Sequence, residues 1–232
     1  KQVDVDKDGF SDVPAVKSVF VHPRFFIYGK RNSNITLGYT LNYEDRNGGD
    51  MAVLNEATSP THQFFNQNKT VRNTIDGVWE KNLNNGGVIT TKANYNIINR
   101  DIITNVFGMN GKQASWYSEM AYTKRFIAHH LVMGINFNGE QFTKHLPDSS
   151  LLPNDAFTTL GAFIQDDWKL NEVLTLQSGL RIDHNNTYGN FILPRVSLMY
   201  KVNNKVTMRM GGGGGRMERP AHFHCAPNRR LP

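Results

Sequence analysis

The chain has 232 residues, of which 39% are hydrophobic and 20% charged, so it is neither a disordered tail nor an apolar bundle of helices. A single cysteine excludes a disulfide framework and a zinc site built on several cysteines. No run of about 18 apolar residues is present, which excludes a membrane-spanning helix. A membrane-spanning β-strand is not excluded, because it needs only about ten residues with one apolar face.

The net charge of +6 is concentrated towards the end of the sequence, where six Lys or Arg from Lys205 onward face one acid, Glu218. A nucleic-acid-binding protein would gather basic residues on one folded face, so we expect no nucleic-acid partner. The sequence starts at Lys1 without the charged-then-apolar form of a secretion signal, and we expect this start to be internal to a longer protein.

Alternation of apolar and polar residues with a period of two predicts an all-β chain. In residues 34–44 the odd positions are Ile, Leu or Tyr and the even positions are mostly polar, and residues 174–183 repeat the pattern. Helical spacing is nowhere sustained. The candidate strands, in chain order, are 18–29, 33–44, 72–82, 87–98, 114–125, 128–140, 157–169, 173–184, 190–202 and 205–214.

The predicted connections alternate in length. The short turns are at 30–32, 83–86, 126–127, 170–172 and 203–204, and the longer links are at 45–71, 99–113, 141–156 and 185–189. Short turns at one end and long loops at the other are typical of an antiparallel, up-and-down transmembrane β-barrel. The polar strand faces also carry charges that a sandwich core would not accept but a water-filled lumen would, namely Glu44, Glu119, Glu140, Arg181 and Arg195.

Several runs in a fixed order give the sequence a family resemblance. They are Q-D-D-W at 165–168, L-T-L-x-x-G-L-R-x-D at 174–183, Y-G at 188–189 and P-R-x-S-x-x-Y at 194–200. Together they resemble the barrel region of TonB-dependent outer-membrane receptors, and the likeness covers most of residues 1–210. The glycine-rich run at 210–220 departs from the family, because it has no aromatic residue and its proline is displaced by one position.

The resemblance implies part of a barrel of about 22 strands, with about ten strands present here and no plug domain. It implies a location in the Gram-negative outer membrane, with membrane lipid as a partner and no enzyme activity. It also implies TonB-energised uptake of a scarce nutrient (a ferric siderophore, cobalamin or a glycan), with TonB acting through the plug on a small extracellular ligand. Without the plug this segment alone would not be competent for gated uptake.

We divide the chain into an extracellular acidic loop at 1–17, a barrel segment at 18–214 and an anomalous, irregular tail at 215–232. The tail contains His222, His224 and Cys225, which have metal-ligand chemistry but lack a fourth ligand. The run of five glycines at 211–215 lacks the Gly-Lys-Ser/Thr ending of a phosphate loop and fits a barrel strand better.

The sharpest local motif is D-V-D-K-D-G-F-S-D, which places Asp4, Asp6, Asp8 and Asp12 at positions one, three, five and nine of a calcium-loop pattern. Gly9 stands at position six, where a sharp turn is needed. The bidentate Glu of position twelve is replaced by Ala15. The motif predicts a weak Ca²⁺ site, the one candidate cofactor, and its alternative is an acidic, solvated loop.

The remaining candidates are weaker. His129 and His130 lie beside a short turn, where we expect solvated polar positions, and the 45–71 loop is a candidate for ligand contact. Two pairs, Asp166–Asp167 and Asp183–His184, could suggest an outer-membrane protease that uses Asp and His, but strand spacing places them roughly 20–30 Å apart in height. General acid–base partners must lie within hydrogen-bond reach, so we expect no catalytic site.

Two alternatives to the receptor segment stay open. One is a self-contained small outer-membrane barrel that acts as a passive pore or an adhesin. The other is a soluble β-sandwich that binds calcium and carbohydrate.

Overall fold

The computed structural model describes residues 3–30, 32–55, 60–145 and 154–215. They form one antiparallel sheet and a single short helix, α1 (Met51–Leu54). A search of these residues finds no helix with the length and apolar character needed to cross a membrane. The candidate ligands His222, His224 and Cys225 lie outside the described residues.

The sheet has eleven strands in up-and-down order. They are β1 (Ala15–Val21), β2 (Arg24–Gly29), β3 (Ser33–Gly49), β4 (Phe65–Asn82), β5 (Gly87–Thr104), β6 (Gly108–Arg125), β7 (His129–Lys144), β8 (Asp155–Lys169), β9 (Leu174–Asn185), β10 (Gly189–Lys201) and β11 (Thr207–Gly213). From β3 to β11 each strand pairs with the next one in the chain, which confirms the predicted all-β, up-and-down architecture.

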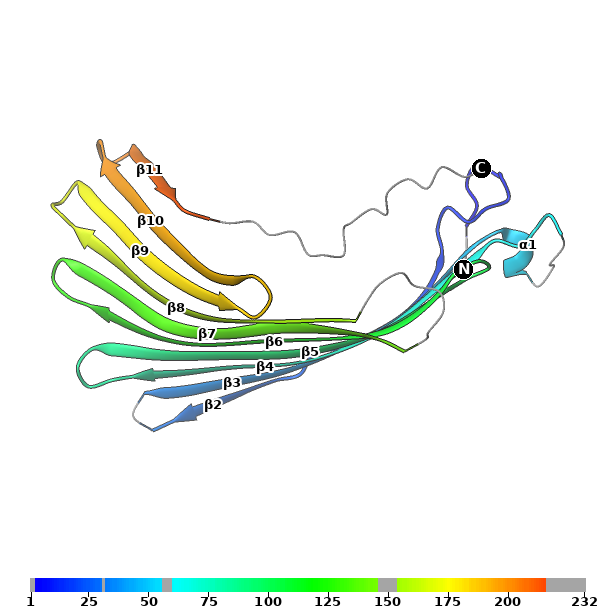
Figure 1. The fold of residues 1–232 in the computed structure, drawn as a ribbon, viewed down its shortest axis with the longest axis horizontal. Coiled ribbons are helices and arrows are strands. Elements are labelled where there is room, and N and C mark those ends of the chain that lie inside the picture. Colours follow the sequence, from blue (N-terminus) through cyan, green and yellow to red (C-terminus); the bar gives the residue numbers. More distant parts are fainter. Residues whose placement is uncertain (1–2, 31, 56–59, 146–153, 216–232) are drawn as a thin grey trace.

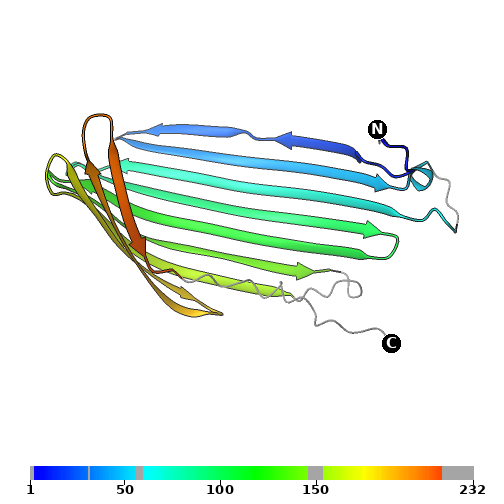
Figure 2. The same ribbon diagram turned by 90° about the horizontal axis from the view of Figure 1, so that it is seen from above.

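The sheet curves into an open trough. Its short turns gather at one end, and α1 lies at the other end (Figure 1). The view from above shows β10 and β11 turning across the long strands, so the trough bends most sharply there (Figure 2). Among the described residues, β1 and β2 at one edge do not pair with β11 at the other. The sheet is therefore not closed, and a self-contained small barrel is not favoured.

The first predicted strand, 18–29, is two strands in the structure. β1 and β2 both pair with β3 in one continuous register, and His22 and Pro23 separate them. Proline has no N–H to donate to a sheet, so it interrupts the strand at this edge. The predicted count of ten strands was therefore low by one.

Several strands extend further towards the α1 end than the alternation predicted. β5 and β6 are joined by residues 105–107, so the long link expected at 99–113 was wrong. β9 and β10 are joined by 186–188, which agrees with the expected link at 185–189 to within one residue at each end. Segments such as Asn99–Asp101 are polar on both faces, which hides the period of two, yet they still pair with β6. Strand pairing needs only backbone groups, so it continues where the alternation ends.

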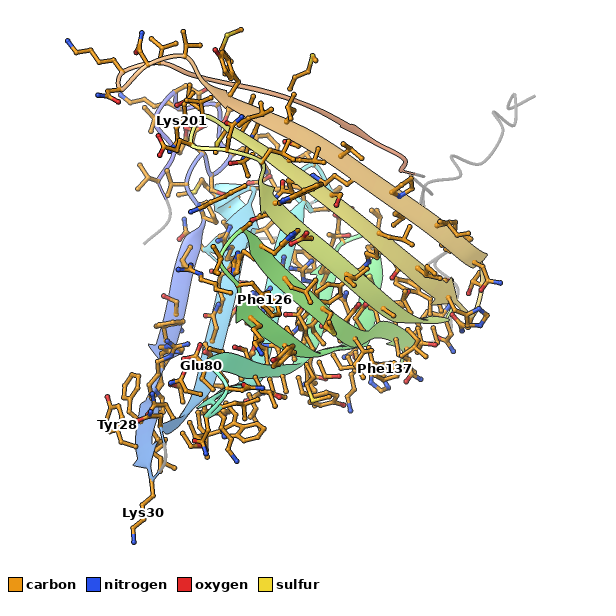
Figure 3. All side chains as sticks on the ribbon, turned by 90° about the vertical axis from the view of Figure 1, so that its left-hand side faces the viewer. Tyr28, Lys30, Glu80, Phe126, Phe137 and Lys201 are labelled. Atoms are coloured by element: carbon orange, nitrogen blue, oxygen red, sulfur yellow. The ribbon has the colours of Figure 1, made fainter. Side chains whose placement is uncertain are left out.

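The two faces of the sheet have different chemistry, and the register shows that the apolar positions of successive strands adjoin. Ile35 lies opposite Trp79, Met120 opposite Ile135 and Ile182 opposite Ile192. In β3 these apolar residues occupy every second position from Ile35 to Tyr43. Figure 3 views the trough end-on, with Phe137 of this face on its outer side. We call this surface the outer belt and the opposite, polar surface the inner face.

The outer belt remains open to its surroundings. Ile75, Ile135 and Ile192 are 61%, 51% and 68% exposed, and no hydrophobic residue in the described ranges is buried. The residues buried in these ranges are instead glycines of the sheet and four polar residues, Asp50, Asn136, Asn185 and Ser197. A sandwich buries the apolar faces of two sheets against each other. This single sheet has no such core, so the β-sandwich alternative was wrong.

Candidate functional site

Ion pairs line the inner face between neighbouring strands. Arg24 Nη2 lies 3.3 Å from Asp76 Oδ2, and Arg181 Nε lies 2.8 Å from Asp183 Oδ2. Each carboxylate lies directly above a glycine of the neighbouring strand. A Cβ on Gly38 would collide with the carboxylate of Asp76, and a Cβ on Gly161 would collide with that of Asp183. The glycines therefore allow charged side chains to lie flat against the sheet.

A hollow of about 790 Å³ opens where the trough bends, between β6 and β8–β11. Its polar lining on the inner face includes Arg181, Arg195 and Arg209, with Glu119 across from them on β6. The hydroxyl of Tyr117 donates to Glu119 Oε2 at 2.6 Å, and Lys92 Nζ lies 3.7 Å from Glu119 Oε1. Guanidinium groups therefore line one side of the hollow, and the other side carries Glu119, whose carboxylate already contacts Tyr117 and Lys92.

The predicted calcium loop is ordered by its own carboxylates. Asp4 Oδ1 accepts the Lys7 N–H at 2.7 Å, and Asp4 Oδ2 accepts the Gly9 N–H at 3.1 Å. Asp6 and Asp8 accept the N–H groups two residues further on. One carboxylate oxygen from each of Asp4, Asp6 and Asp8 lies within 4.8 Å of the others, a spacing that carboxylates around one cation could adopt.

The fourth predicted ligand does not join this group. Asp12 Oδ2 accepts the Val5 N–H at 2.7 Å, which closes the base of the loop. The structure therefore brings together three of the four predicted aspartates. Hard oxygen ligands suit Ca²⁺, although three carboxylates fill only part of its usual shell of six to eight oxygens.

The acidic loop packs against the connection between β3 and β4. Met51 N–H donates to the Gly9 carbonyl at 2.9 Å, and Gly49 N–H donates to Ser11 Oγ at 2.8 Å. The rings of Phe10 and Phe64 lie 6.3 Å apart. These contacts link two segments more than 35 positions apart in the sequence, so local spacing could not predict them.

Asp50, the first residue of the connection between β3 and β4, is buried and only 4% exposed. Its Oδ1 caps α1 by accepting the Ala52 N–H at 2.8 Å, and its Oδ2 lies 2.6 Å from His62 Nδ1. Burial alone would raise the pKa of the Asp50 carboxyl, but the contacts with His62 and the α1 backbone outweigh it and lower that pKa. The predicted ligand-contact loop at 45–71 is thus shorter than expected and is held by this pair.

The two histidines near a short turn form acid contacts that the sequence did not predict. His129 Nδ1 lies 2.6 Å from Asp166 Oδ2, and on the other face His130 Nδ1 lies 3.7 Å from Asp167 Oδ2. The ring of His129 also stacks on Trp168 at 5.4 Å. Both histidines therefore contact an acid instead of being only solvated as predicted. These contacts follow from the register between β7 and β8, which the sequence alone does not give.

The register keeps Asp166–Asp167 and Asp183–His184 apart, as expected. Asp167 lies opposite Gln177, six residues along β9 from Asp183, which corresponds to about 20 Å at strand rise. His184 Nδ1 lies 2.7 Å from the Asn190 side-chain oxygen. The five-glycine run begins in β11, as predicted for a barrel strand.

The comparisons with known proteins agree with this geometry. A model of the TonB-dependent receptor-like β-barrel family matches residues 18–214. A chain of the FpvAI–pyocin S2 complex superposes with a TM-score of 0.67 at 13% identity, covering 87% of this chain and 35% of that one. No curated protein sequence matches.

Two further structures show the same fold. The siderophore receptor PirA from Acinetobacter baumannii has a TM-score of 0.57 at 14% identity, covering 82% of this chain and 32% of that one. A mutant of the ferric enterobactin receptor PfeA from Pseudomonas aeruginosa, in complex with enterobactin, has a TM-score of 0.61 at 11% identity, covering 90% of this chain and 35% of that one. The chain thus spans about a third of these receptors.

An up-and-down sheet with an apolar outer belt and a charged inner face is the wall of a transmembrane β-barrel. The family match over most of the sequence makes the assignment specific, and the chain belongs to the TonB-dependent receptor β-barrel family. Members of that family are outer-membrane transporters of Gram-negative bacteria rather than enzymes.

Proposed function

We propose that this chain forms part of the barrel wall of a Gram-negative outer-membrane receptor that imports a ferric siderophore. The outer belt carries this proposal. Its apolar positions span nine residues in β3, from Ile35 to Tyr43, which agrees with the roughly 9–11 residues that a tilted strand needs to cross a bilayer. Backbone groups in lipid must be paired, and the sheet ladder pairs them.

The siderophore is favoured over the other nutrients by the neighbouring structures. PirA is a siderophore receptor and PfeA a ferric enterobactin receptor, and both share the fold of this chain. The inner face, lined by ion pairs such as Arg24–Asp76, then borders the aqueous path. By family membership we propose that TonB drives import through a plug domain that fills the lumen.

Refolding tests the membrane assignment. The full chain is diluted from denaturant into detergent micelles or into plain buffer, and circular dichroism and heat-dependent gel mobility are recorded. We expect β-structure with a heat-modifiable band in detergent and aggregation in buffer. A folded monomer in plain buffer would contradict the assignment, because the outer belt would then be hydrated.

The substrate is tested in cells. The parent gene is deleted from a strain that lacks its other siderophore receptors, and growth is measured under iron limitation with single purified ferric siderophores. We expect loss of growth on one siderophore and rescue by the restored gene. Normal growth on every siderophore, together with lost uptake of cobalamin or a glycan, would reassign the substrate.

We further propose that Asp4, Asp6 and Asp8 bind Ca²⁺ weakly at the extracellular end of the wall. Support comes from their converging carboxylate oxygens and from the left-handed φ of +90° at Gly9, which permits the turn. Calorimetric titration of the refolded chain with Ca²⁺ should show binding that the double substitution Asp6→Asn and Asp8→Asn removes. Asp12→Asn is the matched control. It should bind Ca²⁺ as tightly as the unmodified chain, because the Asp12 carboxylate accepts a hydrogen bond from the loop backbone and does not join the three converging aspartates.

A further inference from the structure

The inner face of the last three strands carries cations without enough acids to balance them. Arg181, Arg195 and Arg209 come from β9, β10 and β11, and all line the 790 Å³ hollow. Asp183 binds Arg181 at 2.8 Å. Within the described part of the chain, neither Arg195 nor Arg209 forms an ion pair.

The register explains why the hollow forms around Arg195. Its direct neighbours across the sheet are Gly179 on β9 and Gly213 on β11. Neither glycine has a side chain to fill the space beside the guanidinium. On β11, Gly211 likewise lies opposite Ser197, so the floor of the hollow is bare backbone on that side. Arg195 is therefore long, cationic and flanked by open space.

The acids near the hollow are already engaged. Glu119 accepts the Tyr117 hydroxyl and lies 3.7 Å from Lys92 Nζ. Asp167 Oδ1 accepts side-chain amides of Gln165 and Gln177 at 3.3 and 2.7 Å. The excess positive charge at Arg195 and Arg209 is consequently available to a ligand.

We propose that this hollow is a carboxylate-binding site, with Arg195 and Arg209 as the binding groups and Arg181, held by Asp183, as the third cation of the wall. A guanidinium presents a planar fork of N–H donors that matches a carboxylate in two parallel hydrogen bonds. The volume lies in the range of small-ligand pockets, about 300–1,000 Å³. The site rests on the proposed function, because that function makes the inner face the lumen of a barrel.

Calorimetry on the refolded full chain tests the site with tricarballylate, a tricarboxylate without other functional groups. We expect the single changes Arg195→Gln and Arg209→Gln each to weaken binding at least threefold and the double change at least tenfold. Arg195→Lys should retain part of the affinity, because it keeps the charge but loses the fork. Arg46→Gln is the matched control, because Arg46 is paired with Glu44 away from the hollow, and it should bind within twofold.

A second titration with hexaglutamate identifies the source of the carboxylate. Binding of hexaglutamate alone, with the same dependence on Arg195 and Arg209, would support the site and assign it to an acidic polypeptide segment. Equal tricarballylate affinity in the double variant would overturn the proposal, as would no binding of either probe to a folded chain. Heat-dependent gel mobility reports folding separately, so a failed site is distinguished from a failed membrane assignment. If the double variant does not fold, Arg209→Gln at the exposed strand β11 decides the outcome.

Discussion

His129 Nδ1 lies 2.6 Å from Asp166 Oδ2 on the same face as the outer belt, near the short-turn end. Asp166 lies at the edge of the outer belt, next to the short turns. The imidazole ring of His129 stacks on Trp168. Asp166 Oδ1 is buried and has no hydrogen-bond partner in the described structure. A half-buried carboxylate beside apolar side chains needs a polar partner, and the His129 ring lies within hydrogen-bond distance of it.

Removing either member of this pair should destabilise the wall modestly. We expect His129→Gln and Asp166→Asn to show a coupling free energy of up to about 1 kcal/mol in a double-mutant cycle, because both side chains are partly exposed. Urea unfolding in detergent measures it, and fully additive effects of the two changes would contradict the contact.

Gly161 should not tolerate a side chain. A Cβ there would collide with Asp183 Oδ1 and Asn136 Oδ1 and would lie 3.0 Å from Arg181 Nη2. We expect Gly161→Ala to cost about 1–3 kcal/mol, as overpacking usually does. Unfolding in detergent measures the loss.

Gly212→Ala is the matched control for that change. Gly212 is also a strand glycine, and a Cβ on it would have nothing within 4 Å. We expect its effect to stay within about 0.5 kcal/mol. Equal effects of the two substitutions would show that the crowding around Gly161 has no energetic consequence.

The Asp50–His62 contact predicts an acid-sensitive loop. The pKa of Asp50 is lowered below its ordinary value of 3.8, so the carboxylate contributes its stabilisation above pH 3.8. That contribution is lost as the pH falls through the lowered pKa of the folded state. Hydrogen-exchange protection of the Ala52 amide, corrected for the intrinsic rate, should therefore collapse at strongly acidic pH.

Asp50→Asn provides the comparison, because an amide at this position does not titrate. We expect weaker protection of Ala52 at neutral pH and little change on acidification. Protection in the unmodified chain that stays constant down to about pH 2 would contradict the assigned role of the Asp50 carboxylate.

The sequence predicts the outer belt well, because one face of each strand is apolar and the period of two is visible. It predicts the strand ends poorly. Residues such as Asn99 and Asp101 lie in a stretch of β5 that is polar on both faces, so they show no alternation although they are fully paired. The alternation of apolar and polar side chains depends on what each face of a strand contacts, whereas the hydrogen bonds between strands depend only on backbone groups.

The candidate sites divide in the same way. Asp4, Asp6 and Asp8 are predicted because a loop motif is local. The contacts of His129 and His62 depend on register and on loop packing between distant residues. The alternation predicts Arg195 as a lumen charge, but the glycines beside it depend on the register of β9 and β11 with β10, which the sequence does not show.

In a barrel wall, β4 presents Ile75 to lipid and its neighbour Thr74 to the lumen. Single cysteines are placed at each position in a Cys225→Ser background, labelled with an environment-sensitive dye and reconstituted in bilayers with lipid-attached quenchers. We expect strong quenching and a blue-shifted emission for the label at 75, and weak quenching for the label at 74, because their side chains point to opposite faces of β4. Equal quenching at both positions, or stronger quenching at 74, would contradict this orientation.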